Sequence, residues 1–187
     1  MKGPLVILSG PSGSGKSKVI SGVLRGNGRI HLAVSATTRP PRRGEQDGNH
    51  YFFWDRDKFE GEIEAGSFLE WFEVVGNYYG TLRSQVDPFR ENGLGVLLEI
   101  DVQGAAAIRQ QYPEAVSVFL KTRTFDEYER RLRNRGTENE EQIRRRLAKG
   151  RQEEERVGEF DHVVINDDLE TAVAEFKAII ARAFTKG

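Results

Sequence analysis

A stretch of eight residues near the N-terminus has the composition and spacing of a loop that binds phosphate. It matches the pattern GxxxxGK[ST] and consists of Gly10, Pro11, Ser12, Gly13, Ser14, Gly15, Lys16 and Ser17. Glycines let backbone N–H groups turn toward an anion, and a helix that starts here adds its partial positive charge. Lys16 can then reach the β- and γ-phosphates of a nucleotide, and the Ser17 hydroxyl can bind Mg²⁺. The pattern therefore predicts a binding site for a nucleoside triphosphate.

A carboxylate follows a second apolar segment, at residues 96–98. Asp101 stands where a buried strand is predicted to end, and a carboxylate there can hold Mg²⁺ directly or through a water molecule. Many strands end in Asp, so Asp101 alone is weak evidence for a metal site. The phosphate-binding loop, which is expected beside it, makes this role more specific. We therefore predict that Ser17 and Asp101 are the metal ligands.

A basic loop lies at residues 37–45, with the sequence TTRPPRRGE. Its prolines restrict the backbone, and the guanidinium groups of Arg39, Arg42 and Arg43 can each grip phosphate oxygens through two hydrogen bonds. Tyr51 follows shortly after. The loop is interpreted as a second anion site, although the arginines alone are also consistent with a solvated basic turn.

The composition limits the classes of function. The 187 residues carry 28 basic and 29 acidic side chains, a net charge of −1, and no cysteine. Near-zero charge argues against a protein that coats nucleic acid, and the lack of cysteine excludes disulfides and thiolate metal sites. The longest apolar runs are far shorter than the roughly 20 residues of a membrane span, and no signal segment is evident. We expect a soluble cytoplasmic protein without membrane partners.

Short apolar segments alternate with helical patterns along the chain. The segments at 5–8, 96–98, 116–120 and 163–165 are continuously apolar, as in strands that are covered on both faces. Helical patterns include Val19 to Leu24, Ala105 to Ile108, and Ala172 to Ala183, the last opened by Asp167 or Asp168 as N-cap. The alternation predicts an α/β fold with a parallel sheet and flanking helices.

Two segments interrupt this alternation. Residues of about 35 to 92 are rich in aromatic and turn residues, with a hairpin pattern at 73–79, and predict a small mixed α+β insertion. The arginine-rich segment 123–156 is too polar for a core element, and Thr137 with Glu140 matches a capping box that would start a helix. We predict one domain, with a core of about 1–34, 93–125 and 158–187.

The spacing Thr38-Arg39-x-x-Arg42-x-x-Glu45-x-x-Gly48-x-x-Tyr51-x-Phe53 resembles the guanylate kinase signature. Together with the phosphate-binding loop, it makes the match specific. The similarity runs from about residue 4 to 184 and includes the segments at 68–71, 76–81, 99–104, 135–138 and 165–168. The resemblance implies a P-loop nucleoside monophosphate kinase that reversibly transfers the γ-phosphoryl group of ATP to GMP, giving ADP and GDP, with Mg²⁺, in purine nucleotide metabolism.

The same resemblance implies that the insertion of about 35–92 binds GMP. The residues implied in GMP binding are Ser35, Arg39, Arg42, Tyr51, Glu70, Tyr79, Gly80, Thr81 and Asp101. Elementary chemistry supports the guanine assignment, because the N1–H and amino donors of guanine suit the Glu70 carboxylate, while the Ser35 hydroxyl can donate to O6. Adenine has a bare N1 acceptor on that edge and would be penalised.

The arginine-rich segment becomes, by resemblance, a helical lid of about 126–157. Arg135 and Arg146 would then join Lys16 and Arg42 as catalytic residues around the transferring phosphoryl group. Asn166 would lie near the adenine of ATP. Lys18 follows the phosphate-binding loop among the expected ATP-binding residues, but the family usually has a small hydroxyl residue there, which puts ATP affinity in question.

The acceptor is a phosphate oxygen that is largely ionised at neutral pH, so no general base is expected, and the three histidines are expected to have packing or surface roles. Two other functions compete. A non-catalytic guanylate kinase-like scaffold tends to lose the phosphate loop or the lid arginines, which this chain retains. A related kinase for ribose bisphosphate would have no use for Glu70 and Ser35. The sequence leaves open the oligomeric state and the preference between GMP and dGMP.

Overall fold

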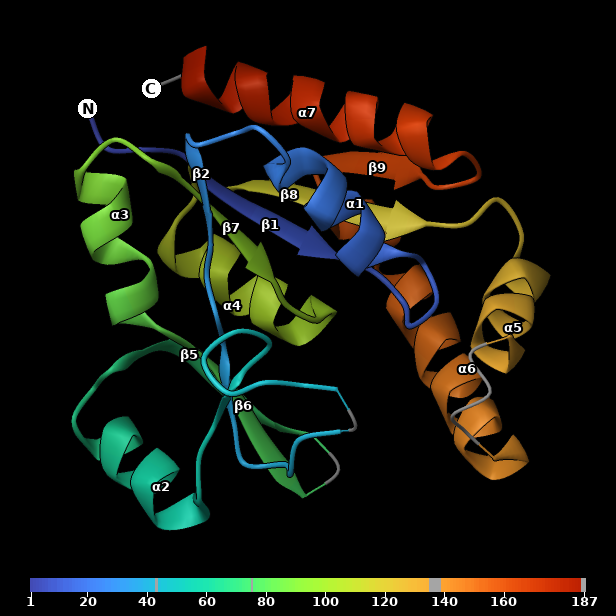
Figure 1. Ribbon diagram of the computed structural model, residues 1–187, viewed down its shortest axis with the longest axis horizontal. Helices are drawn as coiled ribbons and strands as arrows, with labels where there is room; N and C mark the ends of the chain where they lie inside the picture. The colour runs from blue at the N-terminus through green and yellow to red at the C-terminus, as the bar shows by residue number, and fades with distance from the viewer. Residues whose placement is uncertain (43, 75, 135–138, 186–187) are drawn as a thin grey trace.

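The core of the protein is a parallel sheet. The computed structural model describes residues 1–42, 44–74, 76–134 and 139–185, and within them the five strands of this sheet have the order β2-β7-β1-β8-β9 (Figure 1). Every neighbouring pair runs parallel. The strands are β1 (Leu5–Ser9), β2 (Ile30–Leu32), β7 (Gly95–Glu99), β8 (Val116–Lys121) and β9 (His162–Ile165). The predicted α/β fold is confirmed.

The central strand β1 is buried on both faces. Leu5 and Ile7 pack into an apolar cluster with Ile108 of α4, whereas Val6 and Leu8 face the opposite cluster, which contains Phe176 of α7. Burial on both faces is why this strand is a continuous apolar run rather than an alternating one. The helices that cover the two faces are α1 (Lys16–Leu24), α7 (Leu169–Thr185), α3 (Asp87–Glu91) and α4 (Val102–Gln111).

The predicted helix starts are partly confirmed. Asp168 precedes α7, and its Oδ1 accepts a hydrogen bond from the Thr171 backbone N–H, so Asp168 is the N-cap. The predicted capping box of Thr137 and Glu140 includes Thr137, which lies outside the described residues. Helix α6 begins at Glu140, and its capping box is formed by Asn139 and Gln142.

A second, smaller sheet is built from the segment predicted as an insertion. Its strand order is β4-β3-β6-β5, and β5 and β6 form the predicted antiparallel hairpin, with Val74 paired to Asn77. Helix α2 covers this sheet through Phe59, whose ring stacks on those of Phe68 and Tyr78. The elements are β3 (Ala36–Thr37), β4 (Phe52–Phe53), α2 (Arg56–Glu64), β5 (Phe68–Val74), β6 (Asn77–Leu82) and the short 3₁₀ helix η1 (Arg83–Gln85).

The arginine-rich segment forms two helices that project from the core. Helix α5 (Phe125–Arg133) and helix α6 (Glu140–Glu155) lie side by side, and a short 3₁₀ helix, η2 (Val157–Glu159), leads back to β9. Figure 1 shows this pair on the side of the molecule opposite α2. Their few buried apolar residues include Tyr128, Leu132 and Ile143. Within the described residues, no helix combines the length and apolar character that crossing a membrane requires.

Candidate active site

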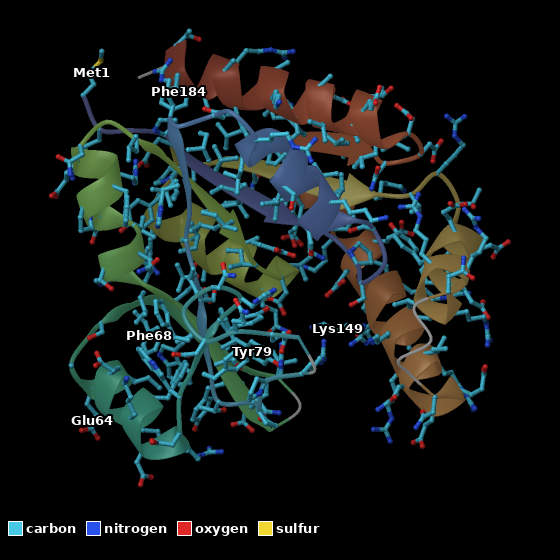
Figure 2. The ribbon with its side chains drawn as sticks, in the orientation of Figure 1. Met1, Glu64, Phe68, Tyr79, Lys149 and Phe184 are labelled. Carbon is cyan, nitrogen blue, oxygen red and sulfur yellow. The ribbon has the colours of Figure 1, made fainter. Side chains whose placement is uncertain are left out.

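A cleft of about 560 Å³ lies between the phosphate-binding loop, the second sheet and α6. In Figure 2 the labelled side chains Tyr79 and Lys149 approach this region from the second sheet and from α6. The residues predicted from the sequence that line it are Gly10, Ser12, Gly13, Gly15, Lys16, Ser17, Ser35, Arg39, Arg42, Tyr51, Glu70, Tyr79, Gly80, Asp101 and Arg146. Five others, Pro11, Ser14, Lys18, Thr81 and Asn166, are not part of its lining, and Arg135 lies outside the described residues.

The phosphate-binding loop connects β1 to α1, which begins at Lys16 as the pattern predicts. Gly10 has a φ of 145°, and a Cβ there would stand 2.1 Å from the carbonyl oxygen of Leu120, so only glycine fits beside β8. The Lys16 ammonium folds back over the loop and donates to the Gly10 carbonyl, at 2.6 Å. The loop is thus shaped to hold an anion at the start of α1.

Two side chains from distant segments hold the loop from behind. The Asn166 amide is buried and donates to the carbonyl of Ser14, at 2.7 Å. Arg131 of α5 donates to the carbonyls of Ser14 and Asn166, at 3.3 and 2.7 Å. Asn166 therefore supports the loop backbone, while its predicted place near adenine stays a prediction. Arg131 was missed because no local pattern distinguishes it among the arginines of its segment.

The basic loop is organised by an ion pair. Glu45 accepts two hydrogen bonds from the Arg39 guanidinium, at 2.6 and 2.7 Å, and one from the Arg42 backbone N–H. These bonds, those from Arg39 above all, lower the pKa of Glu45 to about 2. Burial raises the pKa of the neighbouring Tyr51 hydroxyl to about 12, so this hydroxyl remains a hydrogen-bond donor. Arg39 and Glu45 are thus fixed by their ion pair rather than solvated, and the sequence analysis noted Glu45 only as part of the signature.

Glu70 is the buried carboxylate of the cleft. It lies on β5, is only 8% exposed and accepts a 2.6 Å hydrogen bond from the Thr81 hydroxyl. Burial raises its pKa to about 7, with a smaller contribution from the charge of Asp101. Gly104 of α4 leaves room for it, because a Cβ there would lie 3.2 Å from the Glu70 Oε2. An acid held this way suits the recognition of neutral donors better than pairing with a cation.

This burial should cost stability when Glu70 is ionised. Its folded pKa of about 7 exceeds the ordinary 4.5, so the folded chain binds more protons between these pH values and stability falls as the pH rises through that window. The change that Glu70→Gln makes to the free energy of unfolding is therefore expected to be more favourable at pH 8 than near pH 4, by about 2 to 3 kcal/mol. Urea unfolding at the two pH values measures this. The exposed Glu64→Gln is the control, and an equal effect of Glu70→Gln at both values would contradict the assignment.

Asp101 is placed differently from the prediction. Strand β7 ends at Glu99, and Asp101 caps α4, where its Oδ1 accepts hydrogen bonds from the backbone N–H groups of Gln103 and Gly104. Asp101 therefore lies two residues beyond the end of the strand, as the N-cap of α4. The other oxygen, Oδ2, faces the ammonium of Lys149 at 3.4 Å.

The oxygen donors in the cleft fit Mg²⁺. The Oδ2 of Asp101 is not used in capping α4 and faces the ammonium of Lys149, and the Ser17 hydroxyl is exposed at the start of α1. Among the described residues, no group of three or more acidic, His or Cys side chains could hold a metal. Mg²⁺ bound with a nucleotide needs only one or two protein oxygens, because phosphates and water supply the rest.

Helix α6 carries several charged groups into the cleft. Arg146, Lys149 and Glu153 all contribute to its lining, and they follow each other at helical spacing. Burial raises the pKa of Glu153, whereas the positive charges of Lys149 and Lys16 lower it.

None of the three histidines, all within the described residues, lines the cleft.

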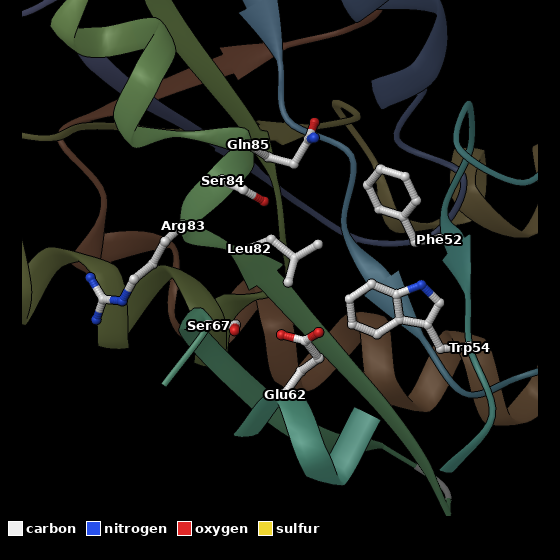
Figure 3. Close-up of a pocket in the computed structure, with 8 residues that line it drawn as sticks. All are labelled: Phe52, Trp54, Glu62, Ser67, Leu82, Arg83, Ser84 and Gln85. Carbon is white, nitrogen blue, oxygen red and sulfur yellow. The ribbon is translucent and has the colours of Figure 1, made fainter. Parts of the chain in front are cut away.

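A separate cavity of about 500 Å³ lies on the other side of the second sheet. Figure 3 shows the rings of Phe52 and Trp54 facing Leu82, with Glu62 below them on α2. The cavity shares no residue with the cleft. The phosphate-binding loop, Arg39 and Arg42 line the cleft and do not line this cavity.

Comparison with known proteins agrees with this geometry. The sequence model of the guanylate kinase family matches residues 2–183. A guanylate kinase of Synechococcus sp. (strain CC9311) is 48% identical over 171 residues, which cover 91% of this chain and 90% of the relative. A guanylate kinase of Vibrio vulnificus (strain YJ016) is 48% identical over 181 residues, 96% of this chain and 87% of the relative.

A solved structure extends the likeness to three dimensions. The crystal structure of guanylate kinase from Anaplasma phagocytophilum matches with a TM-score of 0.79 and 30% identity, over 97% of this chain and 86% of that chain. Family model, relatives and fold all span nearly the whole chain, including the phosphate-binding loop, the second sheet and the arginine-rich helices. The chain therefore belongs to the guanylate kinase family of ATP:GMP phosphotransferases.

Proposed function

We propose that the cleft binds ATP over the phosphate-binding loop and GMP against the second sheet, and that the γ-phosphoryl group passes directly between them. The chain is an ATP:GMP phosphotransferase by family. The observation that carries the residue-level proposal is that a single cleft is lined by the phosphate-binding loop, by Arg39 and Arg42, and by Glu70. Two anion sites and a carboxylate that would recognise guanine lie in one cleft, an arrangement that would orient ATP and GMP for direct transfer.

GMP would be held by its base and by its phosphate. The ionised Glu70 accepts hydrogen bonds from the guanine N1–H and amino group, Ser35 donates to O6, and Thr81 holds the Glu70 carboxylate in place. Arg39, Arg42, Tyr51 and Tyr79 would bind the phosphate; the Arg39 guanidinium already lies over the Tyr51 ring, 5.1 Å from its centroid. Gly80 lines the same cleft and would bind GMP there, while its missing Cβ makes room for the ring of Phe68.

The groups that stabilise the transferring phosphoryl group would be Lys16, Arg42 and Arg146, together with Arg135. Ser17 and Asp101 would hold Mg²⁺, which would neutralise charge on the phosphates. The acceptor oxygen of GMP is already ionised near neutral pH, so the protein supplies position and positive charge rather than a base. The lid arginines must come close to both nucleotides, and their approach would also exclude water.

The division of the chain follows the same roles. We propose a core of about 1–34, 93–125 and 158–187, a GMP-binding insertion of about 35–92 and a lid of about 126–157. Strands β3 to β6 all lie within the insertion, and α6 lies within the lid. A cytoplasmic site of action and the use of dGMP as a second acceptor stay predictions.

The test is ADP release from ATP with Mg²⁺ and each of GMP, AMP, CMP, UMP and ribose 1,5-bisphosphate. GMP should be phosphorylated, and kcat/KM for AMP should be lower by about 10³-fold or more, because adenine leaves Glu70 facing a lone pair. Turnover of the ribose bisphosphate without turnover of GMP would reject the proposal.

The pH dependence should report the ionisation of Glu70. We expect kcat/KM for GMP to fall as the pH drops below about 7, because the protonated acid no longer accepts both guanine donors. The phosphate of GMP adds a second step near pH 6. In Glu70→Gln only that lower step should remain. A wild-type profile that is flat between pH 6.5 and 8 would contradict the role of Glu70.

A further inference from the structure

The two oxygens of the Asp101 carboxylate have different partners. Oδ1 caps α4 through the N–H groups of Gln103 and Gly104, at 3.0 and 3.1 Å. Oδ2 is the oxygen left for a cation, and the Lys149 ammonium of α6 lies 3.4 Å from it. The oxygen that would face Mg²⁺ is therefore in contact with a side chain of the lid.

Lys149 stands between two carboxylates. Besides Asp101, its ammonium lies 3.6 Å from Oε1 of Glu153, one helical turn further along α6, and the Glu153 side chain is only 9% exposed. The same turn of α6 touches the phosphate-binding loop, because a Cβ on Gly150 would lie 3.3 Å from Cβ of Pro11. This contact is where the lid helix meets both the loop and the metal-facing carboxylate.

An ammonium and Mg²⁺ on one carboxylate oxygen repel each other, so the two cations compete for Asp101. We propose that Lys149 is a positioning residue, which holds the metal-facing oxygen of Asp101 until Mg²⁺ arrives with ATP, so that binding of the metal nucleotide breaks the contact between Lys149 and Asp101. The inference rests on the proposed function, because it takes Asp101 as a metal ligand. Because the two cations bind the same oxygen, the free energy of the contact between Lys149 and Asp101 reduces the binding free energy of Mg²⁺ by the same amount.

A second ion pair provides a matched control. Lys121, at the end of β8, lies 3.5 Å from Oε1 of Glu154 on the same helix, with both side chains about one quarter exposed. This pair also connects α6 to the core, but neither residue lines the cleft. Lys121→Met removes an ion pair between lid and core without touching the metal-facing carboxylate.

The experiment measures the dissociation constant of ATP by calorimetry, once with excess MgCl₂ and once with EDTA. The dissociation constant in EDTA divided by that in MgCl₂ measures how strongly the protein prefers the metal nucleotide. The affinity of ATP for Mg²⁺ in solution is the same for every variant, so it cancels when variants are compared. Lys149→Met is expected to raise this ratio about twofold to fivefold, as for the loss of one partly exposed ion pair. Lys149→Arg should restore the wild-type ratio, and Lys121→Met should leave it unchanged.

A ratio that stays the same or falls in Lys149→Met overturns the inference, and so does an equal rise in Lys121→Met, which would indicate general loosening of α6. Circular dichroism checks folding, and Lys149→Gln replaces the Met variant if that variant does not fold. The proposed function fails separately. If the wild-type protein does not phosphorylate GMP, the catalytic assignment is wrong; if it does and the ratio does not move, only the role of Lys149 is rejected.

Discussion

Arg146→Ala is expected to lower kcat for GMP phosphorylation by about 10³- to 10⁵-fold, the range that an arginine contributes to a phosphoryl-transfer transition state. Arg146 lines the cleft from α6, which also contributes Lys149 and Glu153 to the lining. Its planar fork can bind two equatorial oxygens at once, which a lysine cannot reproduce, so Arg146→Lys should recover only a small part of the loss. The coupled ADP-release assay with saturating ATP and GMP measures both variants.

Arg145 is the matched control on the same helix. It pairs with Glu141 at 2.6 Å, and its side chain is 74% exposed. Arg145→Ala removes the same charge from the same helical turn but away from the cleft, and should keep kcat within about twofold of the wild type. If Arg145→Ala and Arg146→Ala lost activity equally, the effect would belong to the overall charge or folding of α6 and not to a contact with the phosphoryl group.

Lys16→Met is expected to lower kcat by about 10³-fold, because the ammonium at the start of α1 is the fixed positive charge closest to the β- and γ-phosphates in the proposed pose. This ammonium donates a hydrogen bond to the Gly10 carbonyl within its own loop, which keeps it beside the start of α1. The KM for GMP should change little, because in the proposed arrangement GMP binds against the second sheet and not over the phosphate-binding loop.

Lys18 provides the comparison for Lys16. It lies two residues further along α1, is exposed and is not part of the cleft lining. Lys18→Met should keep kcat near the wild-type value, and Lys18→Thr, which introduces the hydroxyl usual in the family, tests whether ATP affinity rises. A loss in Lys18→Met comparable with that of Lys16→Met would show that the loop needs general positive charge rather than a positioned ammonium.

Much of the fold is predictable from local pattern. Strands β1, β7 and β8 are buried on both faces, so their apolar runs have no exposed positions to dilute the signal. Strand β2 was missed because it has only three residues at the edge of the sheet, with His31 in the middle. The hairpin of β5 and β6 was predictable because Gly76, with φ of 76°, supplies the turn that the pattern requires.

The site is predictable to the extent that its residues are close together in sequence. The phosphate-binding loop and the basic loop are continuous segments, and their chemistry follows from residue type and spacing. Asp101 was placed correctly in the cleft but not at the end of the strand, since whether a carboxylate caps a helix depends on where the backbone turns. Glu45 could have been recognised from its spacing to Arg39, which allows the paired hydrogen bonds that the structure shows.

The sequence by itself determined the family that the chain resembles and predicted two anion sites, because those signals lie in contiguous residues with fixed spacing. Only the tertiary structure decided how distant segments act on each other. Arg131 and Asn166 hold the phosphate-binding loop across 117 and 152 residues of sequence, and Lys149 reaches Asp101 from the lid. The raised pKa of Glu70 has the same origin, since burial comes from neighbours that the chain brings together only when it folds.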